Sequence, residues 1–370
     1  MPASRASRRR LGVIGSLRPN RGAVSQADPE RSSRRPVAGS RRLVCSASMS
    51  RRPHIVFILT DQQRYDSLGC NGHPHAVTPH LDSLAGESVV FDRCLTPNSV
   101  CMPSRASIMT GLYPSAHGVW QNGCFLARAC YVPWLSDKEM IGADHPARGT
   151  HPSNIPTFAD LLGQAGYRTA AAGKLHLTPT QAHPALGFEE SVQRWRDDAS
   201  MAEWHGPYFG FDEVHLTLGH GEMIDGHYGQ WLRTRHPDQD AARRRAAAGP
   251  RPFAEVSQLY VGGLDIACHP TTWIADRACE VIRQQESDDR PLLLWVGIPD
   301  PHHPFSPPAE LAREFETHAT AGVCAADPSG KPSAYADIAA GPGSMRVPTE
   351  SIRLIRQYTD AMVHLIDRAV

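Results

Sequence analysis

The chain has 370 residues, and 41% of them are hydrophobic, which suits one large or two small folded domains with a buried core. Lys and Arg together number 38, as do Asp and Glu, so the net charge is near zero and argues against a chain dominated by nucleic-acid binding. No apolar run is long enough to span a membrane. The nine cysteines are an odd number without a Cys-x-x-Cys pair, so they favour a reducing compartment, and we expect a cytoplasmic protein.

Residues 1–50 differ in composition from the rest, because Arg and Ser dominate and Asp28 and Glu30 are the only acids. They fit a basic disordered leader. They also fit an export signal, since residues 7–11 (SRRRL) loosely resemble a twin-arginine motif, and the protein would then be periplasmic. We favour a third interpretation, a mis-assigned start with translation beginning at Met49, because the pattern of a folded protein starts there.

The first predicted strand is 54–60 (HIVFILT), an apolar, β-branched run typical of a parallel strand buried on both faces. It leads to Asp61 and Gln62, at the strand end where open α/β sheets bind ligands. Thr78 and Pro79 predict the start of a helix. The apolar residues 89–91 (VVF) predict a second strand.

Residues 103–110 predict a helix that ends at Gly111. Cys101 then lies at a helix N-terminus, where the helix dipole favours negative charge, and Arg105 lies one turn further on the same side. Taken alone, Cys101 also fits a buried apolar thiol.

The remaining elements alternate between helix and strand, in this order: helix 156–165, strand 167–172, helix 271–285 and strand 291–298. Residues 236–252 and 319–345 are rich in Ala, Gly, Pro and charge, and we predict loops or insertions there. The alternation indicates an α/β fold, a largely parallel central sheet with helices on both faces.

Several polar side chains follow these strands. Asp61 and Gln62 offer hard oxygen ligands for a divalent cation such as Ca²⁺ or Mg²⁺. Lys174 and His176 follow the strand 167–172, and His302 follows the strand 291–298. Each also has a structural explanation, as a turn residue, a solvated charge or a loop histidine. Their shared place at strand ends favours a cationic pocket around a metal, suited to a doubly charged oxyanion.

Four motifs resemble those of sulfatases and their close relatives. They are TDQQR at 60–64, the signature NSVCMPSRASIMTGLYPSAHGVWQNG at 98–123, GKLHL at 173–177 and PHHPF at 301–305. The resemblance runs from His54 to the C-terminus and is densest up to Gly123, and it implies a helix at 358–367, which resembles the family helix before the last metal motif. The Asp-Gln pair at 61–62 and Asn122 look more like the branch that includes phosphonate monoester hydrolases.

The resemblance implies that a sulfatase-maturing, formylglycine-generating enzyme oxidises Cys101 to an aldehyde. One hydroxyl of the hydrated aldehyde would bind one divalent metal, first Ca²⁺ and otherwise Mg²⁺ or Mn²⁺, together with Asp61 and Gln62. That hydroxyl would attack the ester, and the second would allow collapse to the aldehyde and release of the anion. Lys174 and His302 would bind the substrate and its leaving oxygen.

By the same resemblance, Arg105 and His176 would hold the diol, and Asn122 would contact the substrate. The expected substrate is a small-molecule ester, with no nucleic acid involved, and the expected activity is that of a sulfuric ester hydrolase such as an arylsulfatase. A hydrolase of phosphonate monoesters or phosphodiesters is the alternative.

The family completes its metal site with an Asp-His or Asp-Asn pair, usually before Gly, and no Asp-His-Gly or Asp-Asn-Gly occurs in this sequence. We therefore expect residues 51–370 to be the N-terminal part of a sulfatase catalytic domain whose C-terminal part is missing. The absent pair also leaves open a third function, that of an inactive remnant or anion-binding protein.

Overall fold

One sheet with mostly parallel strands organises the fold. In a computed structural model of the protein, residues 52–128, 155–318 and 349–370 are described, within a unit that runs from Arg51 to Val370. The strands are β1 (Ile55–Leu59), β2 (Arg168–Gly173), β3 (Glu213–Leu218), β4 (Asp225–Gly226) and β5 (Leu292–Gly297), and they lie in the order β1-β5-β2-β3-β4. The pairs β1–β5, β5–β2 and β2–β3 are parallel, and β4 is antiparallel to β3. The predicted largely parallel α/β sheet is confirmed.

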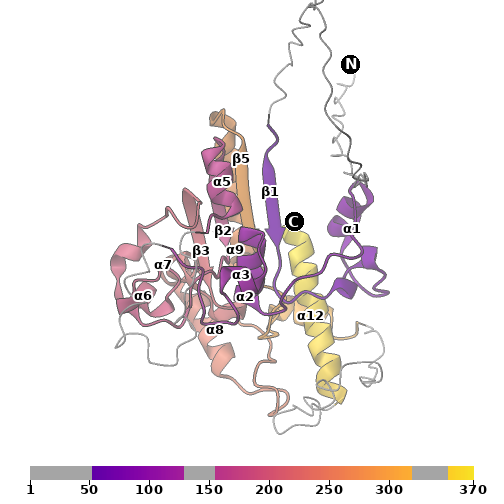
Figure 1. The fold of residues 1–370 in the computed structure, drawn as a ribbon. Helices are drawn as coiled ribbons and strands as arrows, with labels where there is room; N and C mark the ends of the chain where they lie inside the picture. Colours follow the sequence, from indigo (N-terminus) through magenta and orange to yellow (C-terminus); the bar gives the residue numbers. More distant parts are fainter. Residues whose placement is uncertain (1–51, 129–154, 319–348) are drawn as a thin grey trace, which may run out of the picture. The chain divides into compact units, whose positions relative to one another are not determined.

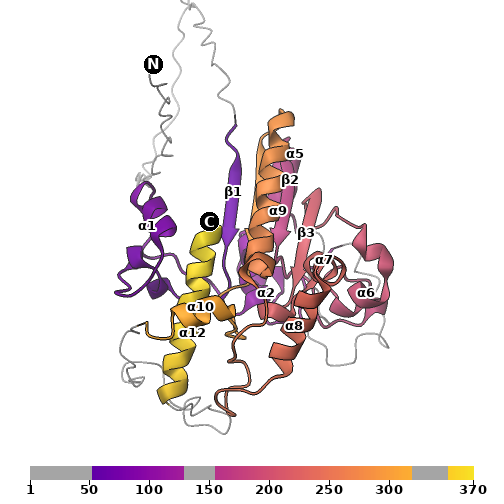
Figure 2. The same cartoon turned by 180° about the vertical axis from the view of Figure 1, so that it is seen from behind.

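Helices cover both faces of this sheet, as Figures 1 and 2 show from opposite sides. The helices are α1 (Pro79–Gly86), α2 (Cys101–Thr110), α3 (Pro114–His117), α5 (Phe158–Gln164), α6 (Val192–Asp197), α7 (His227–Arg235), α8 (Pro237–Ala248), α9 (Pro270–Gln284), α10 (Ala309–Glu314) and α12 (Thr349–Ala369). No helix within these described ranges is both long enough and apolar enough to cross a membrane.

Strand β5 divides the hydrophobic core, because successive side chains of a strand point to opposite faces. Leu293 and Trp295 pack with α2 and α5 on one face. Leu292, Leu294 and Val296 pack with α7, α9 and one residue of α12 on the other face. All six residues of β5 are buried, so the continuous apolar run reflects burial on both sides.

Most predicted elements lie within two residues of the observed ones. The predicted helix 103–110 begins earlier, at Cys101, and ends at Gly111, whose φ of 71° is the left-handed conformation that glycine adopts at low cost. Helix α5 begins after Thr157, which forms a reciprocal capping box with Asp160. The predicted helix 358–367 is the second half of α12.

Two predictions about the fold are wrong. Residues 89–91 form no strand and are 64%, 47% and 74% exposed, and no strand in the described part of the chain pairs with them. Residues 237–248 form helix α8 rather than a loop. Its Ala and Arg residues favour helix, and the buried Arg243 donates to the carbonyls of Glu222 and Ile224.

Strand β1 is correctly placed but is not buried on both faces. Ile55, Phe57 and Leu59 pack against the core, whereas Val56 and Ile58 remain 46% and 42% exposed. β1 is the edge strand of the sheet in the described part of the chain. Residues 319–345, which we predict to be a loop, lie outside the described residues.

The start of α1 is capped from a distant part of the chain. Thr78 makes no side-chain cap, and its hydroxyl instead donates to Asp82 Oδ1 at 3.1 Å. The carboxylate of Asp367 in α12 accepts the backbone N–H groups of His80 and Leu81, at 3.3 and 2.7 Å. The last helix therefore supplies the negative charge that the N-terminus of α1 favours.

Candidate active site

The carboxyl ends of β1, β2 and β5 meet the first turn of α2. The backbone N–H of Asp61, after β1, donates to the carbonyl of Asp300, after β5, at 3.1 Å and joins the two loops. Lys174 follows β2 directly, and its Nζ lies 2.6 Å from Asp61 Oδ2. Arg105 Nη2 lies 3.1 Å from the same oxygen, and the Sγ of Cys101 lies 3.4 Å from Asp61 Oδ1. Three of the predicted site residues thus surround the carboxylate of a fourth.

This carboxylate is ionised despite its burial. Burial raises the pKa of Asp61, but the charges of Lys174 and Arg105 outweigh burial and hold the pKa well below its usual range. Burial and the neighbouring Arg105 lower the pKa of Lys174, while Asp61 raises it in part. The cluster is therefore one anion held between two cations, and these cations are available to an incoming oxyanion.

Two glycines and one tryptophan place Lys174. Gly173 and Gly297 are paired in the β2–β5 register, and the backbone N–H of Lys174 donates to the Gly297 carbonyl at 2.8 Å. A Cβ on Gly297 would lie 2.1 Å from the Lys174 carbonyl oxygen, so no larger residue fits there. That oxygen accepts from Trp295 Nε1 at 3.0 Å and from Arg105 Nη1 at 2.8 Å.

Cys101 is the first residue of α2 and is half-buried. Burial raises the pKa of its thiol, the charge of Lys174 lowers it in part, and Asp61 raises it further. The thiol is therefore protonated at neutral pH and is a weak nucleophile. Asn122 lies next to it, because Asn122 Oδ1 accepts the backbone N–H of Met102 at 3.1 Å.

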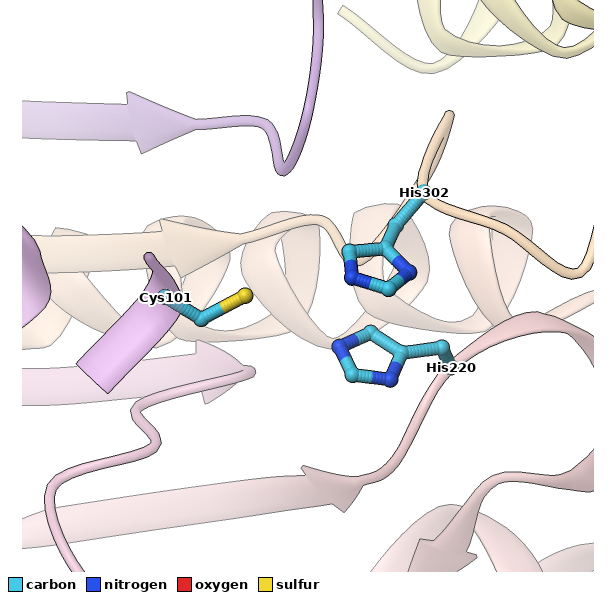
Figure 3. A group of neighbouring side chains, drawn as sticks. All are labelled: Cys101, His220 and His302. Atoms are coloured by element: carbon cyan, nitrogen blue, oxygen red, sulfur yellow. The ribbon is translucent and has the colours of Figure 1, made fainter. Parts of the chain in front are cut away.

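Two stacked imidazoles face the thiol, as Figure 3 shows. His302 follows β5 and His220 follows β3, and their ring centroids lie 3.7 Å apart at an interplanar angle of 9°. Burial is the main cause that lowers the pKa of His302 to about 4 and that of His220 to about 2. Both rings are therefore neutral at pH 7.

The tautomers of these rings follow from their partners. His302 Nδ1 donates to the carbonyl of His303, which leaves Nε2 with a free lone pair. His220 Nε2 accepts from the ammonium of Lys174, so the proton of the neutral ring is on Nδ1. Lys174 thus connects the carboxylate of Asp61 to the imidazole of His220.

His176 lies behind this pair. Its ring is 6.3 Å from that of His220, and its Nδ1 is buried without a hydrogen-bond partner among the described residues. The buried Glu190 accepts the backbone N–H groups of His176, Leu177 and Thr178 at 2.5, 2.6 and 2.8 Å, and so fixes this segment. The positive φ of His176, 57°, is held by these bonds.

His220 and Glu190 were missed by sequence reasoning. His220 follows β3, whose sequence EVHLTL at 213–218 alternates polar and apolar residues as a strand does, so recognising that strand would have placed His220 at the same sheet edge. Nothing in the sequence marks Glu190, because its partners are backbone groups far along the loop.

Gln62 is placed differently from the other predicted residues. It is exposed, its φ is 57°, and it lines a cavity of about 360 Å³ with His73, Phe305 and Asp360. The structure thus brings together Asp61, Cys101, Arg105, Lys174 and His302, with Asn122 and His176 beside them and Gln62 on the neighbouring cavity. The catalytic, substrate and metal roles of these residues stay predictions.

The donor atoms include a possible metal site. Asp61 and the side chain of residue 101 are close enough to share one cation, and the ionised carboxylate suits a hard one. Among the described residues, the group of three metal-ligating side chains with atoms within 4.8 Å of one another is Cys101, His220 and His302. The carboxylate and residue 101 therefore fit part of a hard-cation site, and the second group fits a softer one.

Comparisons with known proteins agree with this geometry. The family model described as Sulfatase matches residues 53–369. The uncharacterized sulfatase YidJ of Escherichia coli is 25% identical over 268 residues, which cover 72% of this chain and 41% of YidJ. The N-acetylgalactosamine-6-sulfatase of Canis lupus familiaris is 33% identical over 265 residues, which cover 70% of this chain and 41% of that protein.

The fold is similar to that of solved relatives. The crystal structure of the phosphonate monoester hydrolase of Agrobacterium radiobacter matches with a TM-score of 0.58 at 24% identity, over 86% of this chain and 57% of that one. The chain spans about two fifths of the length of the two curated relatives, 41% in each case. Since the family model covers nearly the whole described sequence, the chain belongs to the sulfatase family.

Proposed function

We propose that the protein hydrolyses sulfuric esters at residue 101 after Cys101 has been converted to formylglycine. One observation carries this proposal. The Cys101 side chain faces Asp61, Lys174 and His302, a setting suited to an anionic ester, yet the pKa of its thiol is raised by burial. A protonated thiol is a poor nucleophile, so chemistry at this position needs another group on residue 101.

The residues around position 101 bind the charge of the ester and assist the departure of its alcohol. Lys174 and Arg105 hold the negative charge of the ester, because they are buried cations fixed by Asp61 and the β2–β5 backbone. The Nε2 of His302 faces the leaving oxygen, and an anion bound there raises the pKa of the imidazole and favours proton transfer to the alcohol. Asn122, which lies beside residue 101, would contact the substrate, and His176 and Arg105 would hold the diol.

We further propose that Asp61, Gln62 and residue 101 hold one divalent cation, with Ca²⁺ as the first choice and Mg²⁺ or Mn²⁺ next. When bound, the cation and the hydrated aldehyde supply a nucleophilic oxygen at neutral pH. Asp61 is suited to this role because it stays ionised, and Gln62 can reach the ion by a change of side-chain conformation from the neighbouring cavity.

A second candidate substrate class is phosphonate monoesters and phosphodiesters. Gln62 stands where many sulfatases have a second acid, and Asn122 lies against the first turn of α2, next to residue 101. A neutral amide in place of a carboxylate lowers the negative charge next to the substrate. Sulfate and phosphate esters have similar shapes, so the two classes compete for the same pocket.

The test begins with the chain co-expressed with a formylglycine-generating enzyme and checked by peptide mass analysis at Cys101. Hydrolysis of aryl sulfates, phosphonate monoesters and phosphodiesters is then measured with added Ca²⁺, with Cys101→Ala as the inactive control. We expect aryl sulfates to be turned over fastest. Fastest turnover of a phosphonate monoester or phosphodiester would assign the protein to the second class.

A parallel assay uses the chain extended by the C-terminal segment of a sulfatase relative. Activity in the extended protein alone would show that the given chain lacks ligands for the metal. Complete conversion of Cys101 without hydrolysis in either form would reject both functions and favour an inactive anion-binding protein.

The maturing enzyme is the partner that this function requires, and it must share a compartment with the chain. We propose the cytoplasm for that compartment, on the cysteine content of the sequence. The check is the distribution of the native protein between cytoplasmic and periplasmic fractions, and a periplasmic product would favour residues 1–50 as an export signal.

A further inference from the structure

Three metal-ligating side chains from separate elements converge before any maturation takes place. Cys101 comes from the start of α2, His220 from the loop after β3 and His302 from the loop after β5. One ligand atom of each lies within 4.8 Å of the other two. Figure 3 shows the Cys101 sulfur directed at the edges of the two stacked rings. The three donors are a thiol and two imidazoles, a set that favours Zn²⁺ over Ca²⁺ or Mg²⁺.

Closing around an ion requires the two imidazoles to turn as well as to approach, because their rings stack at an interplanar angle of 9° and the in-plane lone pairs of parallel rings do not converge. Ligands of a tetrahedral Zn²⁺ lie about 3.5 Å apart, so the observed separations need to shrink by little more than about 1 Å. His302 already presents Nε2 as a free lone pair, because its Nδ1 is bound to the His303 carbonyl. The hydrogen bond from His302 Nδ1 to the His303 carbonyl orients the ring, as outer-shell partners of zinc-binding histidines do.

We propose that the unmatured chain, with Cys101 still a thiol, binds one Zn²⁺ through Cys101, His220 and His302, with water in the fourth position. The thiol loses its proton to solvent as the sulfur–zinc bond forms, and no electron is transferred. This site goes beyond the proposed hydrolysis, since it exists only before maturation. A bound ion covers the sulfur of Cys101.

Lys174 opposes this binding. Its ammonium contacts the His220 Nε2 that the ion needs, and its positive charge repels a cation. Zn²⁺ therefore displaces Lys174 from His220, while Lys174 keeps its contact with Asp61 at 2.6 Å. Removing the ammonium is expected to tighten zinc binding, which is the opposite of its expected effect on hydrolysis.

The first test measures alkylation of the unmatured chain by iodoacetamide, with and without one equivalent of Zn²⁺. Peptide mass analysis reports each cysteine separately. We expect Zn²⁺ to slow alkylation of Cys101 at least about tenfold and to leave the exposed Cys94 unchanged. Equal rates at Cys101 with and without Zn²⁺ would overturn the proposal without the need for any variant.

The second test uses Co²⁺ as a coloured substitute for Zn²⁺. We expect a thiolate-to-cobalt charge-transfer band that Zn²⁺ removes, that is absent in Cys101→Ser and that weakens in His220→Ala and in His302→Ala. Cys94→Ser should retain the band, and Lys174→Met should give it at lower Co²⁺ concentration. A band that persists in Cys101→Ser would place the metal elsewhere. The readout is metal binding by the thiol form, so it stands or fails independently of ester hydrolysis.

Discussion

The molecule contains two clusters of neighbouring histidines that use their nitrogens differently. At β3, His205 and His227 stack with centroids 4.4 Å apart, and His215 lies beside them. His227 Nδ1 accepts the backbone N–H of Leu216 and its Nε2 donates to the carbonyl of Trp204, both at 2.8 Å. At the active site, His220 and His302 stack more closely, but their inward nitrogens face Cys101 or Lys174.

Proton affinity does not distinguish His227 from the two active-site rings. Burial is the first cause that lowers the pKa of His227 to about 3, His220 to about 2 and His302 to about 4. What differs is the partner of each nitrogen. Backbone groups occupy both nitrogens of His227, so this ring supports the fold, whereas a ring with one nitrogen turned to a nucleophile or a cation is available for chemistry.

The largest loss of activity is expected from Cys101→Ala, produced together with the maturing enzyme and compared with the matured parent protein. It removes the precursor of the nucleophile, so ester hydrolysis should fall to background, while the apolar core near α2 keeps its packing. The measurement is steady-state hydrolysis of an aryl sulfate together with thermal unfolding. Cys94→Ala, at an exposed cysteine, is the matched control and should retain activity.

Lys174→Ala should have the next largest effect. It removes one of two cations that hold the ester's charge, and losing a single such donor typically lowers kcat about 10²–10³-fold. Arg105 still neutralises Asp61 at 3.1 Å, so we expect a folded protein. The measurement is kcat of Lys174→Ala relative to the parent protein. An unchanged kcat would exclude Lys174 from the reaction.

His227→Ala should have the opposite effect to the two active-site variants, because it should lower the free energy of unfolding and leave kcat unchanged. It leaves the N–H of Leu216 and the carbonyl of Trp204 without partners in a buried site, at a cost of about 1–3 kcal/mol for each unsatisfied group. Denaturant unfolding measures the loss. His215→Ala, at a half-buried ring, is the control with a smaller expected cost, and loss of kcat at full stability in His227→Ala would contradict the distinction.

A smaller effect is expected in the pH dependence of stability. Because the pKa of His227 is lowered to about 3 in the folded protein, the unfolded chain binds a proton that the folded chain does not between pH 3 and pH 6.5. Its contribution is therefore fully present above pH 6.5 and is lost as the pH falls towards 3, with a slope of at most about 1.4 kcal/mol per pH unit. In His227→Gln the unfolding free energy should vary less steeply over this range, and an identical slope would exclude His227 as a cause.

The sequence predicted those parts of the fold in which a local pattern and its surroundings agree. The runs 167–172 and 291–298 became β2 and β5 because they are buried between neighbours. Residues 89–91 are equally apolar but have no partner strand in the described part of the chain and stay exposed. The alternating pattern of residues 213–218 did not lead to a predicted strand. Without that strand, the position of His220 at the same sheet edge could not be predicted.

For the site, too, the sequence predicted what depends on strand positions and did not predict what depends on long-range contacts. Strand ends predicted that Asp61, Lys174 and His302 would meet, since parallel strands share one carboxyl edge. The sequence did not predict that Lys174 would bridge Asp61 and His220, or that Gln62 would line a separate cavity. Those outcomes depend on side-chain directions and on contacts between residues more than a hundred positions apart.

The cap of α1 by Asp367 has a consequence for synthesis on the ribosome. The polypeptide emerges from its N-terminus, so α1 is made long before the carboxylate that caps it, 286 residues later in the contact with Leu81. Strand β1 likewise waits for β5, whose residue Leu293 pairs with Ile55. Until β5 has been synthesised, β1 lacks the strand with which it pairs in the described part of the chain, and its apolar side chains are exposed to aggregation.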